Sequence, residues 1–507
     1  MEKNEKITEQ AKIGLFIKEL REGQGLSQEE LAKKIGTSQS AVARMEDGKQ
    51  NFTTEMIMRI SNALNRKIVS LNNTMDFRVN GGKKLHGKII TNFSKNGSVG
   101  LLCASMLNRG KTTLHGISRI EEVNRVIEVM ESIGVSVKWI AKNSLIVTPP
   151  EVFSMNTINV ASAIKTRSIL MFIGPLIHKM KNFSIPHASG CSLGKRTISA
   201  HAYALQDIGI NTETTNDKHI IKVENLKPAD IVMYEAGDTA CENILMAASK
   251  IDGITKISFA SANYMVQEVC FFLEKLGVRI EGIGTSTLTV HGVKEINMNI
   301  EYSNSEDPIE SMMFISAAVV TDSELTIKRC PIDFLSLELE KLRRMGLKYE
   351  SSERYKSYNG RTDLVDLVIF PSELVALEDK IHPCPYPGIN MDNLPFFVPI
   401  AIKAKGKTMI HDWVYDNRAI YFHDINRLGA KVDLADPHRL YIQGGTTFKP
   451  AQIVCPPALR PAMVMLICML GAEGESLLRD VYMINRGYEE IAQRLNSIGA
   501  DIKIMTE

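Results

Sequence analysis

The sequence predicts an α/β fold of six similar units packed as two lobes, preceded by a small all-α domain. Six times a predicted helix runs into a glycine that opens a short, strand-like apolar segment, and these glycines are Gly134, Gly209, Gly277, Gly346, Gly429 and Gly499. Their separations are 75, 68, 69, 83 and 70 residues. A unit of about 70 residues is too long for a solenoid repeat and recurs too regularly for chance. The chain before residue 76 lacks the repeat and is therefore expected to form a separate domain.

Each unit pairs a glycine-ended helix with a second, strongly apolar helix. The glycines stand where a helix needs a left-handed cap before the chain turns into a strand. The second helices are expected at 99–108, 169–179, 242–250, 311–320, 396–403 and 462–471, and their composition predicts burial. Six such units exceed one core, so we expect two lobes of three. Glycine-ended helices converging from both lobes would place positive N-termini around a cleft that suits an anionic ligand.

Composition indicates a globular protein rather than a membrane or secreted one. The 507 residues are 44% apolar and 23% charged, with no apolar run of about 18 residues and no signal-like N-terminus. The eight cysteines are scattered without a C-x-x-C pair, which favours a reducing cytoplasm and argues against disulfides and structural zinc. We therefore expect a cytoplasmic protein with no membrane partner. A net charge of +2 does not point to any other partner.

Residues 1–72 are predicted to form a domain of short helices. The first helix is expected at 13–22, the third near 38–45 and the fourth near 54–64. Ser27 opens the second helix as its N-cap, with Glu30 at the capping-box position. Gly36 follows this helix, where a tight turn between two helices needs a residue that tolerates positive φ.

This domain, which we call the head, has a motif made of Ser27-Gln28-Glu29-Glu30-Leu31-Ala32, Ile35-Gly36 and the stretch from Ser38 to Gly48. In this motif it resembles the phage-repressor (Cro/C1-type) helix-turn-helix family. The resemblance implies that the third helix enters the major groove of double-stranded DNA, where Ser38, Gln39, Ser40 and Arg44 face bases and Gln28 faces a phosphate. Such heads usually dimerise on paired half-sites, which suggests a homodimer. The alternative is a helical bundle for protein contact, because residues 1–70 carry 12 Lys and Arg against 10 Asp and Glu.

The body, residues 76–507, contains several separate motifs of one enzyme family. They are Ser94-Lys95-Asn96, Arg167-Ser168, Gly190-Cys191 with Gly194 and Arg196, Glu242-Asn243-Ile244, Pro385-Tyr386-Pro387-Gly388, Leu459-Arg460 and Asn485-Arg486-Gly487-Tyr488-Glu489. In these motifs the body resembles the enolpyruvyl transferases, and within them the branch that acts on UDP-N-acetylglucosamine. The resemblance implies a two-lobed inside-out α/β barrel of six repeats, with lobes roughly at 96–303 and at 76–95 plus 304–507. It also implies transfer of the enolpyruvyl group of phosphoenolpyruvate to the sugar 3-hydroxyl, which opens peptidoglycan synthesis. No metal or organic cofactor is implied.

Phosphoenolpyruvate carries a phosphate and a carboxylate, so its pocket needs several fixed cations. By resemblance, Lys95, Arg196 and Arg486 hold it, and Lys95 and Arg486 also take part in catalysis. The planar arginine fork suits both anionic groups, and fixed cations stabilise the charge that develops in a tetrahedral intermediate. The implied substrate-binding set is completed by Asn96, Arg167, Asp307, Arg418 and Arg460.

Two further residues are expected to move protons. Cys191 lies in a loop between glycines with Lys195 and Arg196 behind it, and such cations favour the thiolate. By resemblance the loop closes over the cleft, and Cys191 acts as general acid at the enolpyruvyl methylene or aids product release. The family's base is an aspartate after Pro-Tyr-Pro-Gly, which an ungapped alignment places at Asp392. A shifted alignment would place Asn390 there, and an amide cannot take the proton.

The acceptor half of the site departs from the family pattern. Glu235 stands where the family has a lysine, and Asp238 adds a second negative charge where the nucleotide diphosphate should lie. Ala458, directly before Leu459-Arg460, stands where the family has an aspartate. The phosphoenolpyruvate half is therefore predicted to be intact, and the sugar-nucleotide half to be altered.

The sequence suggests three functions. The first is an active enolpyruvyl transferase with a DNA-binding head, whose acceptor is UDP-N-acetylglucosamine or a related nucleotide sugar. The second is a transcriptional regulator whose body senses phosphoenolpyruvate or a nucleotide sugar with weak or no catalysis. The third is the sister enzyme acting on shikimate 3-phosphate, which is disfavoured because the Cys191 loop and the Arg486 motif belong to the sugar-nucleotide branch. The first two roles could coexist in one chain.

Overall fold

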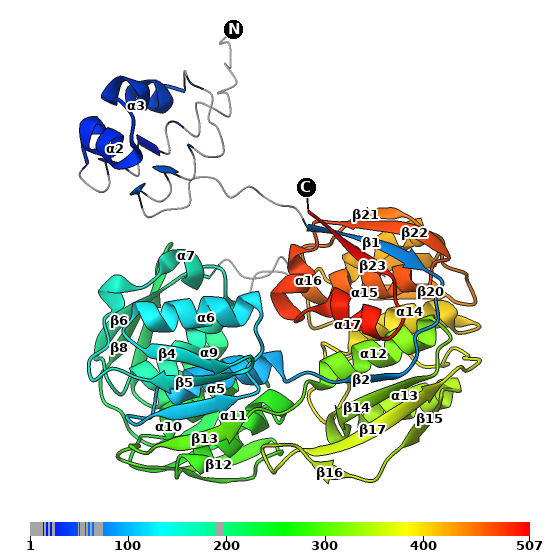
Figure 1. The fold of residues 1–507 in the computed structure, drawn as a ribbon. Coiled ribbons are helices and arrows are strands. Elements are labelled where there is room, and N and C mark those ends of the chain that lie inside the picture. Colours follow the sequence, from blue (N-terminus) through cyan, green and yellow to red (C-terminus); the bar gives the residue numbers. More distant parts are fainter. Residues whose placement is uncertain are drawn as a thin grey trace. The chain divides into compact units, whose positions relative to one another are not determined.

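The chain divides into two compact units, which we describe separately. The computed structural model describes residues 14, 17–18, 21–22, 26–48, 50, 56, 59–60, 63–64, 75–188 and 197–506. One unit, the head, comprises residues 1–74 with 506–507, and the other, the body, comprises Met75–Met505 (Figure 1). Among the described helices, none is long and apolar enough to span a membrane.

The head contains the two central helices that the sequence predicts. Helix α2 spans Gln28–Ile35 and helix α3 spans Gln39–Glu46. Ser27 and Glu30 form the predicted capping box, and Gly36 ends α2 in the left-handed conformation at φ 70°. Of the two outer predicted helices, positions 14, 17–18, 21–22, 56, 59–60 and 63 are helical, and most of their other positions lie outside the described residues.

The body forms six small sheets over the residues that the structure describes, three in each lobe (Figure 1). In the first lobe the strand orders are β13–β3–β5–β4, β6–β8–β7 and β11–β12–β10–β9. In the second they are β15–β17–β14–β2, β18–β20–β19 and β21–β22–β1–β23, with β16 paired to β17. Three sheets take all their strands from one stretch of the chain, and the other three also include β13, β2 or β1 from a distant stretch. The predicted fold of six units in two lobes is confirmed.

The strands are short, as small sheets require. Those of the first lobe are β3 (Thr112–His115), β4 (Ser136–Ala141), β5 (Ser144–Thr148), β6 (Asn182–Pro186), β7 (Ile210–Thr214), β8 (Lys218–Val223), β9 (Asp230–Val232), β10 (Gly253–Ser258), β11 (Arg279–Glu281), β12 (Thr287–Gly292) and β13 (Ile300–Ser303). Those of the second are β1 (Met75–Gly81), β2 (Lys88–Ile90), β14 (Leu325–Pro331), β15 (Lys348–Ser351), β16 (Tyr355–Lys356), β17 (Asp363–Phe370), β18 (Lys407–His411), β19 (Lys431–Asp436), β20 (Arg439–Gln443), β21 (Gln452–Val454), β22 (Gly474–Arg479) and β23 (Ile502–Thr506).

Two helix classes alternate with these strands. The apolar class comprises α5 (Lys95–Ser105), η2 (Arg167–Phe172) with α8 (Ile173–Leu176), α10 (Asp238–Ala248), α12 (Pro308–Val320), η4 (Leu394–Phe396) with α14 (Phe397–Lys403), and α15 (Leu459–Leu470). The glycine-ended class comprises α6 (Glu121–Ser132), α9 (Ser199–Asp207), α11 (Tyr264–Lys275), α13 (Ser336–Met345), η5 (Ala419–Leu428) and α17 (Ile491–Ser497). The short helices η1 (Met155–Thr157), α7 (Val160–Ala163), η3 (Ile332–Phe334) and α16 (Tyr482–Gly487) lie in the connections between these elements.

The six repeat glycines adopt the conformation that their position predicts. All of them have φ between +85° and +104°, a region that side chains with a Cβ rarely enter. Gly209 also meets a steric limit, because a Cβ there would lie 1.9 Å from the carbonyl oxygen of Asn225. The predicted helix ends are therefore confirmed.

The apolar helices form the interior of each lobe, and the sheets lie outside them. All 13 residues of α12 are buried, and α15 is buried from Arg460 to Leu470. Such helices are hydrophobic on every side because each is surrounded by protein. This arrangement is the inside-out barrel that the family resemblance implies.

The chain crosses between the lobes twice, and the two crossings lie side by side. The first runs from β2 to α5 and the second from β13 to α12. The backbone amide of Ser94 donates to the carbonyl of Ser305 at 2.7 Å, and that of Asp307 to the carbonyl of Asn92 at 2.8 Å. These paired segments place the first residues of α5 and α12 next to each other at the lobe boundary.

Candidate functional site

Five predicted site residues of the body lie at or just before the beginnings of the apolar helices. Lys95 is the first residue of α5, Arg167 the first of η2 and Arg460 the second of α15. Asp307 is the N-cap of α12, and Asp392 lies two residues before η4. The expectation that glycine-ended helices supply these ends was therefore wrong for these five residues. The argument for an anionic ligand still holds, because the positive N-terminal ends of several apolar helices meet at one place.

Lys95 and Arg486, which are far apart in the sequence, meet at the carboxylate of Glu122. Lys95 Nζ lies 2.8 Å from Glu122 Oε2, and Arg486 Nη2 lies 4.0 Å from the same atom. Burial alone would raise the pKa of Glu122, but Lys95 and Arg486 outweigh it and lower that pKa to about 2. Two cations beside one carboxylate leave a net positive charge, which suits a small dianion.

Arg167 is next in sequence to Ser168, which contacts the same carboxylate, that of Glu122. The hydroxyl of Ser168 donates to Glu122 Oε1 at 3.3 Å, while Arg167 Nη2 donates to the carbonyl of Thr197 at 2.7 Å. Thr197 follows the segment 189–196, which includes Cys191 and Arg196. These two predicted site residues lie outside the described residues, and their roles remain predictions.

A second cluster surrounds Arg460, which is only 6% exposed. Its Nη2 donates to Asp392 Oδ2 at 3.0 Å and its Nη1 to the hydroxyl oxygen of Tyr488 at 2.7 Å. Burial would raise the pKa of Asp392, but Arg460 and then Arg418 outweigh it, so the net pKa lies below its usual value. Asp392 is therefore ionised at neutral pH.

Asp307 lies between the Lys95 cluster and the Arg460 cluster. Its pKa shifts in the opposite direction to that of Asp392. Its Oδ2 accepts from the backbone amide of Lys95 at 3.4 Å. Burial raises the pKa of Asp307, although Arg460 opposes the shift. Two neighbouring carboxylates with opposite shifts are typical of sites where one group is a base and the other is not.

Arg418 does not fit the predicted role of a substrate ligand. It is 1% exposed, and its guanidinium donates to both oxygens of Asp412, at 2.6 and 2.9 Å, and to the carbonyl of Met391 at 2.7 Å. Asp392 lies 3.6 Å from its remaining terminal nitrogen. Because its donors are used inside the protein, we assign Arg418 as a positioning residue that supports the segment ending at Asp392.

Asn390 and Asp392, the two alternatives for the base, have different surroundings. The side-chain amide of Asn390 donates to Asn263 Oδ1 at 3.1 Å, which links the lobes, and its oxygen accepts from the amide of Asp392 at 2.8 Å. Asn96, also predicted to bind substrate, donates to the hydroxyl of Tyr264 at 3.1 Å. Asp392 is therefore the alternative that lies beside the cations, and Asn390 orients it.

The region predicted to bind the acceptor contains a cavity of about 370 Å³ between the lobes, which Asp238, Asn390 and Met391 help to line. The oxygens of Asp238 accept from Ser261 Oγ at 2.6 Å and from Asn263 Nδ2 at 3.0 Å. Burial raises the pKa of Asp238. Among its described lining residues there is no lysine or arginine, so these walls suit hydroxyl and amide groups better than phosphates.

Sequence reasoning missed Glu122 and the role of Tyr488. Glu122 lies in the first turn of α6, where acidic residues are common because they complement the helix dipole, so nothing marked it as special. Tyr488 lies within the Asn485–Glu489 motif, which could have identified it. Both contacts join residues that are distant in the sequence.

Glu122 provides a stability test with a defined pH window. Because its folded pKa is depressed, the stability it contributes is present above its ordinary value of 4.5 and is lost as pH falls toward about 2. We expect Glu122→Gln to lower the free energy of unfolding by about 2–3 kcal/mol at pH 7, with the difference shrinking below pH 4.5. Urea denaturation of both proteins at several pH values measures this. Glu121→Gln, which affects a surface pair with Arg125, should cost less than about 1 kcal/mol. Equal losses for the two variants would contradict the assignment.

The head presents the predicted DNA-reading residues on one helix. Ser38, Gln39, Ser40 and Arg44 are exposed at or along α3, and Ser38 is its N-cap. Gln28 accepts a hydrogen bond from Gln39 Nε2 at 2.7 Å. Exposed polar side chains at the start of such a helix are compatible with contacts to base edges.

Two family models match this chain. Residues 79–495 match EPSP synthase (3-phosphoshikimate 1-carboxyvinyltransferase), and residues 17–71 match a helix-turn-helix model. The body belongs to the enolpyruvyl transferase family. The transferase is 32% identical over 435 residues to the UDP-N-acetylglucosamine 1-carboxyvinyltransferase of Treponema denticola, covering 85% of this chain and 99% of that protein. It is 30% identical to the enzyme of that name from Bacteroides fragilis strain NCTC 9343, covering 84% and 99%.

Solved structures share the fold of the transferase. The enolpyruvyl transferase NikO from Streptomyces tendae superimposes with a TM-score of 0.73 at 20% identity, over 86% of this chain and 99% of that one. EPSP synthase from Acinetobacter baumannii gives a TM-score of 0.66 at 17% identity, over 85% and 100%. The predicted resemblance to enolpyruvyl transferases with a helix-turn-helix head is therefore confirmed.

Proposed function

We propose that the transferase moves the enolpyruvyl group of phosphoenolpyruvate to the 3-hydroxyl of UDP-N-acetylglucosamine or a related nucleotide sugar and releases phosphate. The observation that carries this proposal is the meeting of Lys95 and Arg486 at Glu122, next to the Asp392–Arg460 pair. One part of the site suits a dianion, and the other offers an ionised carboxylate as a base.

The proposed reaction is an addition followed by an elimination. The acceptor hydroxyl forms a bond to the central carbon of phosphoenolpyruvate, its proton passes to Asp392, and the methylene carbon gains a proton from Cys191. In the elimination, a proton of the new methyl group returns to the Cys191 thiolate, the carbon–oxygen bond to phosphate breaks, and the electron pair of the carbon–hydrogen bond restores the double bond. Lys95 and Arg486, with Arg167 and Arg196, hold the phosphate and carboxylate throughout.

The depressed pKa of Asp392 constrains the timing of proton transfer. A carboxylate held by Arg460 is a weak base and cannot deprotonate a free alcohol before the attack. As the new carbon–oxygen bond forms, the hydroxyl becomes far more acidic, and a weak base is then sufficient. Proton transfer should therefore accompany or follow bond formation.

The relatives support a nucleotide-sugar acceptor more than shikimate 3-phosphate. The first relatives found are named UDP-N-acetylglucosamine 1-carboxyvinyltransferase, at 28–32% identity over most of their length. The carboxylate of Asp238 argues for a related acceptor, or for a different placement of the diphosphate. We place the reaction in peptidoglycan precursor synthesis in the cytoplasm, where the seven described free cysteines would stay reduced.

Phosphate release tests this proposal directly. The full chain is incubated with phosphoenolpyruvate and UDP-N-acetylglucosamine, and then with other nucleotide sugars. Turnover with one of them that falls on Cys191→Ala supports the assignment. No phosphate release with any nucleotide sugar would contradict it.

A regulatory role is the second candidate, and the helix-turn-helix match together with the exposed residues of α3 favours it. In this role the head binds a specific DNA duplex, and substrates bound to the body alter that affinity. Selection from a random duplex library at low salt, with the full chain, identifies the site. Failure to enrich any sequence would contradict DNA reading by the head.

Arg44→Ala is expected to weaken binding to the selected duplex by about 1–3 kcal/mol and to relax its sequence preference, because arginine can contact a guanine edge at two atoms. Lys18→Ala removes the same charge from an exposed position outside α3. It should weaken specific and random duplexes equally. Fluorescence anisotropy with both duplexes at two salt concentrations separates the effects, and identical behaviour of the two variants would count against base reading by Arg44.

A further inference from the structure

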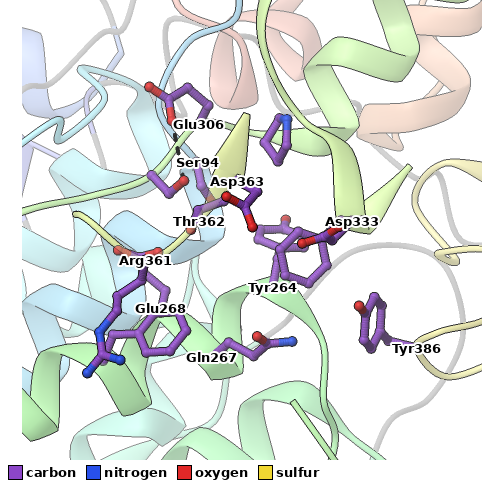
Figure 2. Close-up of a pocket in the computed structure, with 14 residues that line it drawn as sticks. Ser94, Tyr264, Gln267, Glu268, Glu306, Asp333, Arg361, Thr362, Asp363 and Tyr386 are labelled. Atoms are coloured by element: carbon purple, nitrogen blue, oxygen red, sulfur yellow. Dashed lines mark hydrogen bonds between the residues drawn. The ribbon is translucent and has the colours of Figure 1, made fainter. Parts of the chain in front are cut away.

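A second cavity, of about 520 Å³, lies at the lobe crossings, and we call it the hinge cavity (Figure 2). Ser94 and Glu306 help to line it, whereas their neighbours Lys95 and Asp307 belong to the catalytic site. Successive residues of an extended segment point to opposite sides. The same two backbone segments therefore contribute side chains to both the hinge cavity and the catalytic site.

Aromatic rings from both lobes form one wall of the hinge cavity. Tyr264, on α11, packs edge-on against Phe334 with ring centroids 5.9 Å apart, and Phe334 packs against Tyr386 at 5.1 Å. The hydroxyl of Tyr264 accepts from Asn96, a predicted substrate ligand. An occupant of this cavity would thus touch both lobes and a residue that contacts the catalytic site.

The charged groups of the hinge cavity are mostly carboxylates, and Glu268 differs from the others. Glu306, Asp333 and Asp363 each pair with a nearby arginine or lysine. Glu268 is 3% exposed, and its described hydrogen-bond donors are neutral: the Tyr302 hydroxyl at 2.8 Å and Asn359 Nδ2 at 3.0 Å. Burial raises the pKa of Glu268 to about 7. Arg361 also lines the cavity, but its guanidinium pairs with Glu274. A buried carboxylate without an ion-pair partner is strongly stabilised by a cation that enters.

We propose that the hinge cavity binds a small organic cation, with its ammonium group against Glu268 and its apolar body against the rings of Tyr264, Phe334 and Tyr386. Aromatic faces attract cations, and an ammonium forms charge-assisted hydrogen bonds to a carboxylate. A metal ion is a poorer match, because the described residues contain no group of three or more side chains placed to hold one. Such a ligand would contact residues of both lobes.

Calorimetry with benzylamine and with benzyl alcohol, its neutral counterpart, tests the proposal on the full chain at pH 8. Benzylamine should bind at least about tenfold more tightly, because only it carries the ammonium group. Glu268→Gln should remove this preference. Glu473→Gln, at an exposed position that does not line the cavity, should retain it.

Phe334→Leu provides a second variant that does not depend on the carboxylate. It should weaken both probes while leaving the preference for benzylamine, and excess phosphoenolpyruvate should not displace benzylamine. A preference that survives Glu268→Gln, or binding that neither variant alters, overturns the proposal. Phe334 and Tyr386 also line the 370 Å³ cavity on the acceptor side, so the titration is repeated with excess UDP-N-acetylglucosamine. Displacement of benzylamine by this sugar nucleotide would place it in that cavity and overturn the proposal. None of these measurements needs turnover, so a failed phosphate-release assay leaves them interpretable.

Discussion

Asp392→Asn is expected to lower kcat about 1,000-fold while changing the KM for phosphoenolpyruvate only a few-fold, because it removes the proposed base but keeps the shape of the side chain. The asparagine oxygen can still accept from Arg460, which now bonds Asp392 at 3.0 Å. Phosphoenolpyruvate is held at the cation pair instead, so its binding should persist. Steady-state phosphate release with either substrate varied measures both parameters.

Two controls sharpen this test. Asp416→Asn makes the same chemical change at an exposed position nearby and should leave kcat within about twofold, as expected for a surface site. Asn390→Ala removes the alternative residue and its bond to Asn263, and it should affect kcat far less than Asp392→Asn. If Asp392→Asn kept more than a tenth of the activity, another group would have to be the base.

Lys95→Met should lower kcat/KM for phosphoenolpyruvate by about 1,000-fold, roughly 4 kcal/mol, because a fixed cation at a desolvated anion site is lost. The loss has two sources. The substrate loses an ammonium partner, and Glu122 remains as a carboxylate facing Arg486 alone. Initial rates with phosphoenolpyruvate varied at saturating acceptor give the value.

A double-mutant cycle separates these two sources. If the uncompensated carboxylate repels the substrate, Lys95→Met combined with Glu122→Gln should recover part of the phosphoenolpyruvate affinity. Lys138→Met, at an exposed position on β4, should have no comparable effect. A double variant as impaired as the sum of the single ones would mean that Glu122 and Lys95 act independently, contrary to their 2.8 Å contact.

The fold was predictable because its signals are local. A glycine at a helix end reports a backbone conformation that few other residues adopt, and six repeats of that signal define six units. Composition alone predicted that the apolar helices are buried, as α12 and α15 show. In the head, the Ser27–Glu30 capping box and the Gly36 helix end were predictable for the same reason, because each depends on residues only a few positions apart.

The site was predictable only in part. Family motifs pointed to Lys95, Arg460 and Arg486, and the structure brings Lys95 and Arg486 to one carboxylate. The family resemblance also implied that Arg418 binds the substrate, whereas the structure buries it against Asp412. An arginine in a motif can bind a ligand or support the residue that does, and sequence alone does not distinguish these roles.

By itself, the sequence determined the repeat, the separate helix-turn-helix head, the membership in the enolpyruvyl transferases and the types of side chain available to the site. Only the tertiary structure decided which charges face one another: Glu122 between two cations, Asp392 against Arg460, and Glu268 among neutral partners. The physical reason is that helix caps and apolar periods depend on near neighbours in the chain. Ion pairing, desolvation and pKa instead depend on groups tens to hundreds of residues apart that folding brings within a few ångströms.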